Sequence, residues 1–144
     1  MIRNIIALTL FIAYVQARNT TFTNCSEKGV IKFVNVEPCD SDPCTFTSGQ
    51  EVHLNGVLVS PAASNSPQLK VTVKVAGIYF NYPGVSSDAC DYLSCPLEAD
   101  VDTPFALSLK VLSLPLPLET QIRFQLLDSD GSELNCGETT VRVE

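Results

Sequence analysis

The stretch that decides the fold is 69–97, which reads LKVTVKVAGIYFNYPGVSSDACDYLSCPL. Its first seven residues alternate between apolar and polar side chains, the period of two that is typical of a half-buried antiparallel strand. Three aromatic residues follow, Tyr79, Phe80 and Tyr82, and then a loop bounded by two cysteines. A strand that ends in an aromatic cluster beside a disulfide loop predicts the mouth of an apolar pocket. Tyr79 and Tyr82 would either present a hydroxyl there or pack as rim aromatics.

The same alternation recurs on both sides of this stretch. Strands are expected at 29–36, 51–59 with a bulge at Gly56, 105–111 after a turn at 101–104, 120–127 and 134–143. Residues 112–118 contain two prolines and should cover an edge or a rim without joining a sheet. Six to eight short strands with no helix and no repeat indicate an all-β fold, an antiparallel sandwich of immunoglobulin-like type.

The N-terminus has the pattern of a secretory signal peptide. Arg3 precedes an apolar run, and Val15, Gln16 and Ala17 resemble a cleavage site. The run is too short to cross a bilayer core of about 30 Å, which disfavours a membrane anchor. We therefore expect a signal peptide at 1–17 and one domain at 18–144.

The charge balance disfavours some partners. The chain has 9 Lys and Arg against 16 Asp and Glu, so its formal charge is −7, and losing Arg3 makes it about −8. Such acidity argues against nucleic acid and anionic membrane surfaces and suits a soluble protein.

The six cysteines behind a signal peptide predict three disulfides formed in an oxidising compartment. Fifteen pairings are formally open. Short spacing makes Cys39–Cys44, closing a tight hairpin, and Cys90–Cys95 the simplest pairs, which leaves Cys25 with Cys136. Asn19 begins a glycosylation sequon that should be exposed. Asn24 begins a second sequon, and we expect its modification less because it adjoins a cysteine.

The residue inventory disfavours catalysis and metal binding. His53 is the only histidine and falls at an outward strand position, and GxSxG and HExxH motifs are absent from the sequence. The aspartate pairs 40/42, 100/102 and 128/130 fit calcium or acid–base chemistry, but all lie in turns, where aspartate is favoured for backbone reasons. Lys70, Lys74 and Lys110 would either flank an opening or block edge pairing. We expect no enzyme, no metal and no cofactor other than a bound lipid.

Several motifs in order resemble one known family. They are Asn24-Cys25, GVIK at 29–32, VNVEPC at 34–39, Pro43-Cys44, CPL at 95–97 and Cys136-Gly137-Glu138. This pattern is similar to the lipid-recognition (ML) domain family, which includes the Niemann-Pick type C2 sterol carriers and the mite group 2 allergens, and it suggests an arthropod member. The resemblance implies the same three disulfides and a lipid cavity between the two sheets.

The resemblance also implies which residues line that cavity. Carried over by alignment, the lipid-binding positions are Val36, Phe46, Leu54, Val71, Val73, Phe80, Tyr82, Val111, Phe124 and Val141. Two departures from the sterol carriers stand out: Gly137 replaces their tryptophan, and 114–117 reads LPLP. A cavity lined by smaller aliphatic side chains favours a flexible acyl chain over a rigid sterol.

The function expected from these observations is that of a secreted carrier of a sterol, fatty acid or related lipid. It would act as a monomer outside the cell or in the endosomal–lysosomal lumen, with a membrane or receptor contact for ligand transfer and no nucleic acid. Two alternatives remain: a lipid-sensing co-receptor, which would need a basic rim, and an immunoglobulin-like interaction module. The last predicts that side chains fill the space between the sheets.

Overall fold

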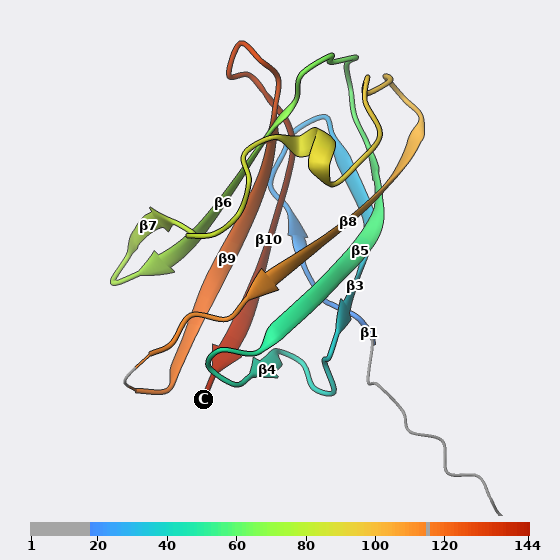
Figure 1. Ribbon diagram of the computed structural model, residues 1–144. Helices are drawn as coiled ribbons and strands as arrows, with labels where there is room; N and C mark the ends of the chain where they lie inside the picture. Colours follow the sequence, from blue (N-terminus) through green and yellow to red (C-terminus); the bar gives the residue numbers. More distant parts are fainter. Residues whose placement is uncertain (1–17, 115) are drawn as a thin grey trace, which may run out of the picture.

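The computed structural model describes residues 18–114 and 116–144, so the expected signal peptide at 1–17 lies outside the described residues. The described chain forms ten β-strands and one 3₁₀ turn. The strands make two facing sheets (Figure 1). The expected all-β sandwich is therefore confirmed. No helix in the described part of the chain is long and apolar enough to cross a membrane.

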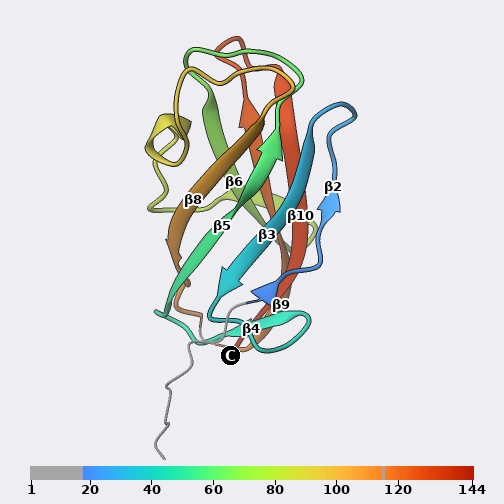
Figure 2. The same ribbon diagram turned by 90° about the vertical axis from the view of Figure 1, so that its right-hand side faces the viewer.

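The two sheets use strands from all parts of the chain. The first sheet has the order β1 (Arg18–Asn19), β3 (Val30–Glu37), β5 (Glu51–Val59) and β8 (Asp102–Lys110). The second has the order β2 (Thr23–Asn24), β10 (Glu133–Val143), β9 (Leu118–Leu127), β6 (Gln68–Val75) and β7 (Ile78–Asn81), and β4 (Cys44–Phe46) pairs with β10. The turn η1 (Ala89–Asp91) lies between β7 and β8 in the chain. Figure 2 shows β8, β5 and β3 crossing in front of the second sheet.

The period-two alternation places one face of each strand inside the sandwich. On β5, Val52 and Leu54 are buried while His53 and Asn55 are exposed. On β8, Leu107 and Leu109 are buried while Ala106 and Ser108 are exposed. The apolar face of each sheet has only the other sheet to cover it, so the two faces pack together.

The hairpin expected at Cys39–Cys44 is wrong. The disulfide forms, but β4 pairs in parallel with β10 rather than folding back on β3. Pro38 cannot donate a ladder hydrogen bond, and β3 ends just before it. The disulfide loop therefore carries the chain from the first sheet to the second (Figure 1).

Two other local predictions are also corrected. The bulge lies on β3, between Ile31 and Phe33, and β5 pairs residue by residue with β8 through Gly56. A side chain at Gly56 would collide with the Phe33 carbonyl oxygen, which would lie 2.2 Å from a Cβ, so this glycine gives room and does not mark a bulge. Strand β8 begins at Asp102, within the segment expected to be a turn. Pro104 is tolerated there because β8 is an edge strand.

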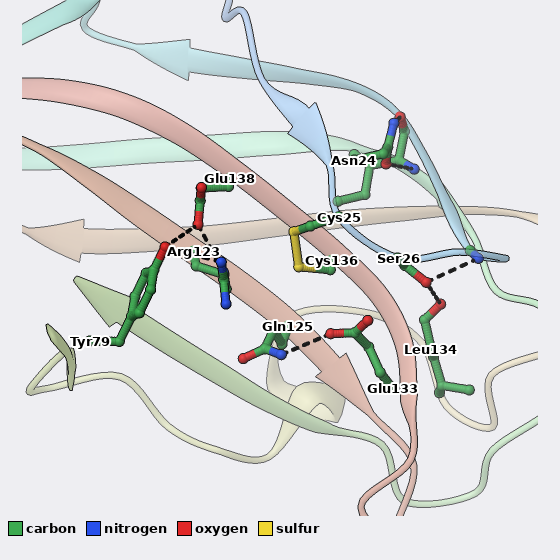
Figure 3. Close-up of a disulfide and its surroundings, with 12 residues drawn as sticks. Asn24, Cys25, Ser26, Tyr79, Arg123, Gln125, Glu133, Leu134, Cys136 and Glu138 are labelled. Atoms are coloured by element: carbon green, nitrogen blue, oxygen red, sulfur yellow. Dashed lines mark hydrogen bonds and ion pairs between the residues drawn. A yellow bond between two sulfur atoms is a disulfide. The ribbon is translucent and has the colours of Figure 1, made fainter. Parts of the chain in front are cut away.

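The three disulfides pair as spacing and resemblance indicated. They are Cys25–Cys136, Cys39–Cys44 and Cys90–Cys95. The first joins residues 111 positions apart and fixes the end of β2 against β10 (Figure 3). The Cys25 amide also donates to the Cys136 carbonyl at 2.9 Å. This bridge braces the edge of the second sheet.

Candidate ligand-binding cavity

A cavity of about 180 Å³ lies between the two sheets. Its walls come from the inward faces of β3, β5 and β8 on one side and of β6, β9 and β10 on the other. Nearly all of these side chains are aliphatic or aromatic. A concave, largely apolar site with few polar groups is the usual form of a small-molecule binding pocket in proteins.

Most of the positions expected to bind lipid line this cavity. They are Val36, Phe46, Leu54, Val73, Tyr82, Val111, Phe124 and Val141. Additional wall residues come from Phe22 and from the proline-containing segment, through Leu112, Leu114 and Leu118. That segment therefore forms a rim, as its two prolines predicted. Phe22 gave no sequence signal, because it lies between two strands of only two residues each.

Two of the expected positions, Val71 and Phe80, do not line the cavity. Val71 is buried in the core beside it. Phe80 lies directly opposite Val73 in the β6–β7 pair but is 50% exposed. The hairpin formed by β6 and β7 projects to the side in Figure 1, so the first sheet does not cover it. An inward register position is buried only where a second layer faces it.

The mouth of the cavity lies at this hairpin. Val75 both lines the cavity and is 41% exposed, which shows where the apolar wall reaches solvent. Across the opening, the Tyr82 hydroxyl donates to the backbone carbonyl of Lys110 at the end of β8. Burial raises the pKa of Tyr82, so the phenol keeps its proton and remains a donor. This hydrogen bond joins the β7 and β8 sides of the mouth.

The opposite end of the cavity is closed by Asn135. Its side chain is 1% exposed, and its Nδ2 donates to the carbonyl of Val59 at 2.9 Å and of Val30 at 3.4 Å. The amide therefore bridges from β10 in the second sheet to β5 and β3 in the first. Asn135 was missed from the sequence. Counting back in twos from the buried Val143 places it on the inward face, which is the signal that could have found it.

Comparison with known proteins agrees with this geometry. A profile of the ML domain matches residues 19–143. The chain belongs to the ML domain family. It is 30% identical over 140 residues to the NPC intracellular cholesterol transporter 2 of Mus musculus, covering 96% of this chain and 94% of that protein. It is 24% identical over 139 residues to the mite group 2 allergen Lep d 2 of Lepidoglyphus destructor, covering 96% of this chain and 97% of the allergen.

The fold comparison gives the same result. The crystal structure of a Niemann-Pick type C2 protein from Japanese carpenter ant superposes with a TM-score of 0.76. The alignment covers 86% of this chain and 99% of the ant protein at 16% identity, so it establishes the shared fold only.

Gly137 leaves room for two neighbouring side chains in the cavity wall. A Cβ at position 137 would lie 2.7 Å from Cδ1 of Ile31 and 3.9 Å from a ring carbon of Phe22. Those two side chains occupy the space that a larger residue would need. An aliphatic and a phenyl group therefore form this part of the cavity wall.

Tyr79 lies on the outer face of the ML domain and not at the mouth. Its hydroxyl donates to Glu138 at 2.7 Å and accepts from Arg123 at 3.0 Å, while Arg123 Nε donates to Glu138 at 2.8 Å (Figure 3). The hydrogen bond to Glu138 raises the pKa of Tyr79. Partial burial opposes ionisation of Glu138, but the hydrogen bonds from Tyr79 and Arg123 hold the pKa of Glu138 below its usual value. This network ties the edge strand β7 to β9 and β10.

Three of the aspartates considered from the sequence, Asp102, Asp128 and Asp130, have partners in the structure. Asp128 accepts from Ser64 at 2.6 Å, Asp130 accepts from Ser132, and Lys32 pairs with Asp102 at 2.7 Å. Within residues 18–114 and 116–144, no group of three or more His, Cys, Asp or Glu side chains is placed to hold a metal ion.

His53 and the two sequons lie on the surface. His53 is exposed and shares a hydrogen bond with Ser108 at 2.7 Å. Asn19 is exposed on β1. The Asn24 side-chain amide makes two hydrogen bonds with the backbone of Ile31: its Oδ1 accepts from the Ile31 nitrogen at 2.9 Å, and its Nδ2 donates to the Ile31 carbonyl. A glycan on Asn24 would have to displace this pairing.

Proposed function

We propose that this ML domain protein is a carrier that encloses a sterol or a fatty-acid-like lipid between its two sheets. The observation that carries the proposal is the apolar cavity with a mouth at Val75. Relatives at about 30% identity are named cholesterol transporters, which supports a lipid as the ligand class. The cavity also counts against a fully packed interaction module.

The physical driving force is removal of apolar surface from water. Burying about ten methylenes contributes roughly 8 kcal/mol at about 0.8 kcal/mol each. Lost freedom of the two partners offsets several kcal/mol of this. Micromolar affinity corresponds to a net binding free energy of about 8 kcal/mol. Because ten methylenes contribute less than this after the cost of association, such affinity needs a longer chain or a sterol skeleton. No catalytic residue is required.

The size of the cavity indicates how loading occurs. Its 180 Å³ falls below the roughly 300–1,000 Å³ of typical ligand pockets. A lipid chain can enter only if the walls move apart. We place that movement at the mouth, where the Tyr82 hydrogen bond and the β6–β7 hairpin can shift without breaking the β3–β5 and β9–β10 ladders.

We place the protein in a secretory compartment, outside the cell or in the endosomal–lysosomal lumen. The three disulfides are typical of oxidising environments. The proposed working form is a glycosylated monomer, modified at Asn19, that contacts a membrane or receptor to hand over its ligand.

Native mass spectrometry of the secreted, glycan-trimmed protein tests the proposal. After organic extraction, we expect one sterol or fatty acid per chain, or uptake of one equivalent when the purified protein is mixed with cholesterol and with stearic acid. A protein that carries no lipid and takes up neither one would contradict the carrier function.

A further inference from the structure

Asn135 and Tyr82 bridge the two sheets at opposite ends of the cavity. In the β5–β8 ladder, Val59 is paired with Asp102 and Glu51 with Lys110. Asn135 donates to the Val59 carbonyl, whereas Tyr82 donates to the Lys110 carbonyl. Eight residues of strand separate the two levels, roughly 26 Å at about 3.3 Å per residue. Asn135 is thus at the end that a ligand entering at the mouth reaches last.

The Asn135 amide is held in one orientation. Both of its hydrogen bonds run from Nδ2 to backbone carbonyls, which cannot donate. Gly29 packs against the same group, and a Cβ there would lie 2.6 Å from Nδ2. Rotating the amide by about 180° would place Oδ1 next to the two carbonyl oxygens, and none of these atoms can donate a hydrogen bond. Oδ1 is therefore directed away from both carbonyls.

Asn135 Oδ1 is the one buried side-chain N or O atom in the described chain that has no hydrogen-bond partner. The other polar side chains on the inner side of the cavity wall all have protein partners; they are Thr20, Tyr82, Tyr92, Thr120 and Thr139. A buried acceptor without a donor is costly, and native proteins rarely leave one empty. Because Asn135 belongs to the cavity wall, the missing donor is one that a ligand can supply.

We propose that the preferred ligand carries a hydroxyl group on the end that enters the cavity first, and that this hydroxyl donates to Asn135 Oδ1. This inference rests on the proposed carrier function. A neutral amide oxygen accepts from an alcohol but repels a carboxylate or sulfate, which are acceptors only. An anionic or polar head group therefore remains at the mouth. The ligand class is a long aliphatic chain or a sterol side chain with a terminal alcohol.

The test measures affinity for ligands that differ only in this hydroxyl. One pair is stearic acid and ω-hydroxystearic acid, and the other is cholesterol and cholesterol hydroxylated at the terminal side-chain carbon. In an apolar cavity the added hydroxyl weakens binding, because it must be removed from water. In the wild type we expect the hydroxylated member to bind at least as tightly as its parent. In Asn135→Leu we expect the ratio of affinities to shift against the hydroxyl by about three- to tenfold.

A second variant and an isomeric ligand serve as controls. Thr139→Val removes a polar wall group that already has a partner, Thr21, and we expect it to leave the ratio within each pair unchanged. A stearic acid hydroxylated in mid-chain has the same composition as the ω-isomer and should bind the wild type more weakly. This comparison remains valid if Asn135→Leu does not fold.

The outcomes separate this inference from the proposed function. If stearic acid and cholesterol both fail to bind, the carrier function is wrong. If they bind but the wild type disfavours the terminal hydroxyl as strongly as Asn135→Leu does, or treats the two isomers alike, the carrier function stands and the role of Asn135 is overturned. Preference for only one of the two pairs identifies whether the alcohol belongs to an acyl chain or to a sterol.

Discussion

The two ends of the cavity are held together by different kinds of contact. At the closed end, Asn135 bonds to carbonyls of two strands, and its neighbour Cys136 is in a disulfide. The end with the mouth also has a covalent crossover at the Cys39–Cys44 loop, but on its Tyr82 side a phenol hydroxyl joins the sheets, and residues 111–114 lie outside the strands. Opening the closed end requires loss of the Asn135 hydrogen bonds beside a disulfide, whereas the Tyr82 side of the mouth can open by breaking one neutral hydrogen bond. This difference predicts that ligand exchange and global stability depend on separate residues.

The largest effect is expected from the disulfide beside the closed end. Replacing Cys25 and Cys136 with serine should lower the free energy of unfolding by about 4–5 kcal/mol, because the bond closes a loop of more than one hundred residues. The matched change at Cys90 and Cys95 should cost about 2 kcal/mol, since that loop is short. Denaturant unfolding measures both. Equal losses would remove the proposed distinction between a global brace and a local one.

Filling the cavity should weaken binding while the protein still folds. In Leu54→Trp, the indole would occupy the space between the sheets, and we expect affinity for stearic acid to fall by at least about tenfold, or 1.4 kcal/mol. Overpacking should cost about 1–3 kcal/mol of stability. His53→Trp, on the outer face of the same strand, is the control and should bind as the wild type does. Unchanged affinity in Leu54→Trp would place the ligand elsewhere.

Removing the hydroxyl at the mouth should speed ligand exchange. Tyr82→Phe loses a hydrogen bond worth about 0.5–1.5 kcal/mol, so we expect the dissociation rate to rise about three- to tenfold. Tyr92→Phe is the control. Tyr92 also lines the cavity, but its hydroxyl donates to Ser86 within the same segment and does not join the sheets. Stopped-flow release of a fluorescent fatty acid would show the difference, and equal rates in the two variants would exclude Tyr82 as the closure.

The smallest effect concerns pH and the hairpin at the mouth. Glu138 has a lowered pKa in the folded protein, so the stability it contributes is present above its unfolded pKa of about 4.5 and is lost as pH falls through the lower folded value. We expect Glu138→Gln to flatten the plot of stability against pH in this range. Thermal unfolding between pH 3 and pH 6, about one to two units on either side of the unfolded pKa, measures the effect. A wild-type curve that matches Glu138→Gln throughout would rule out the contribution.

The sequence predicted the elements whose burial follows from local alternation. Strands such as β5 and β9 lie between other strands and face a second layer, so period two maps directly onto inside and outside. The pattern could not reveal that β4 crosses to β10, because this pairing joins residues about one hundred positions apart. It also could not place Phe80, whose exposure depends on how far the opposite sheet extends.

The candidate site was predictable for the same reason, and only in part. The aliphatic wall residues share the inward face of regular strands, so alignment placed most of them. The polar groups required tertiary structure. Tyr79 and Tyr82 lie three residues apart, yet one joins an outer network and the other closes the mouth. The alternation back from Val143 places Asn135 on the inward face, but its partners Val59 and Val30 lie on other strands far away in the sequence.

The most direct test of the carrier account is a crystal structure of the protein loaded with a stoichiometric fatty acid or sterol. We predict that the lipid lies between the sheets, that the cavity has grown beyond 180 Å³ by movement at the Tyr82–Lys110 side, and that the contact between Asn135 and Val59 is retained. A lipid bound on an outer face, with the cavity unchanged, would contradict the account.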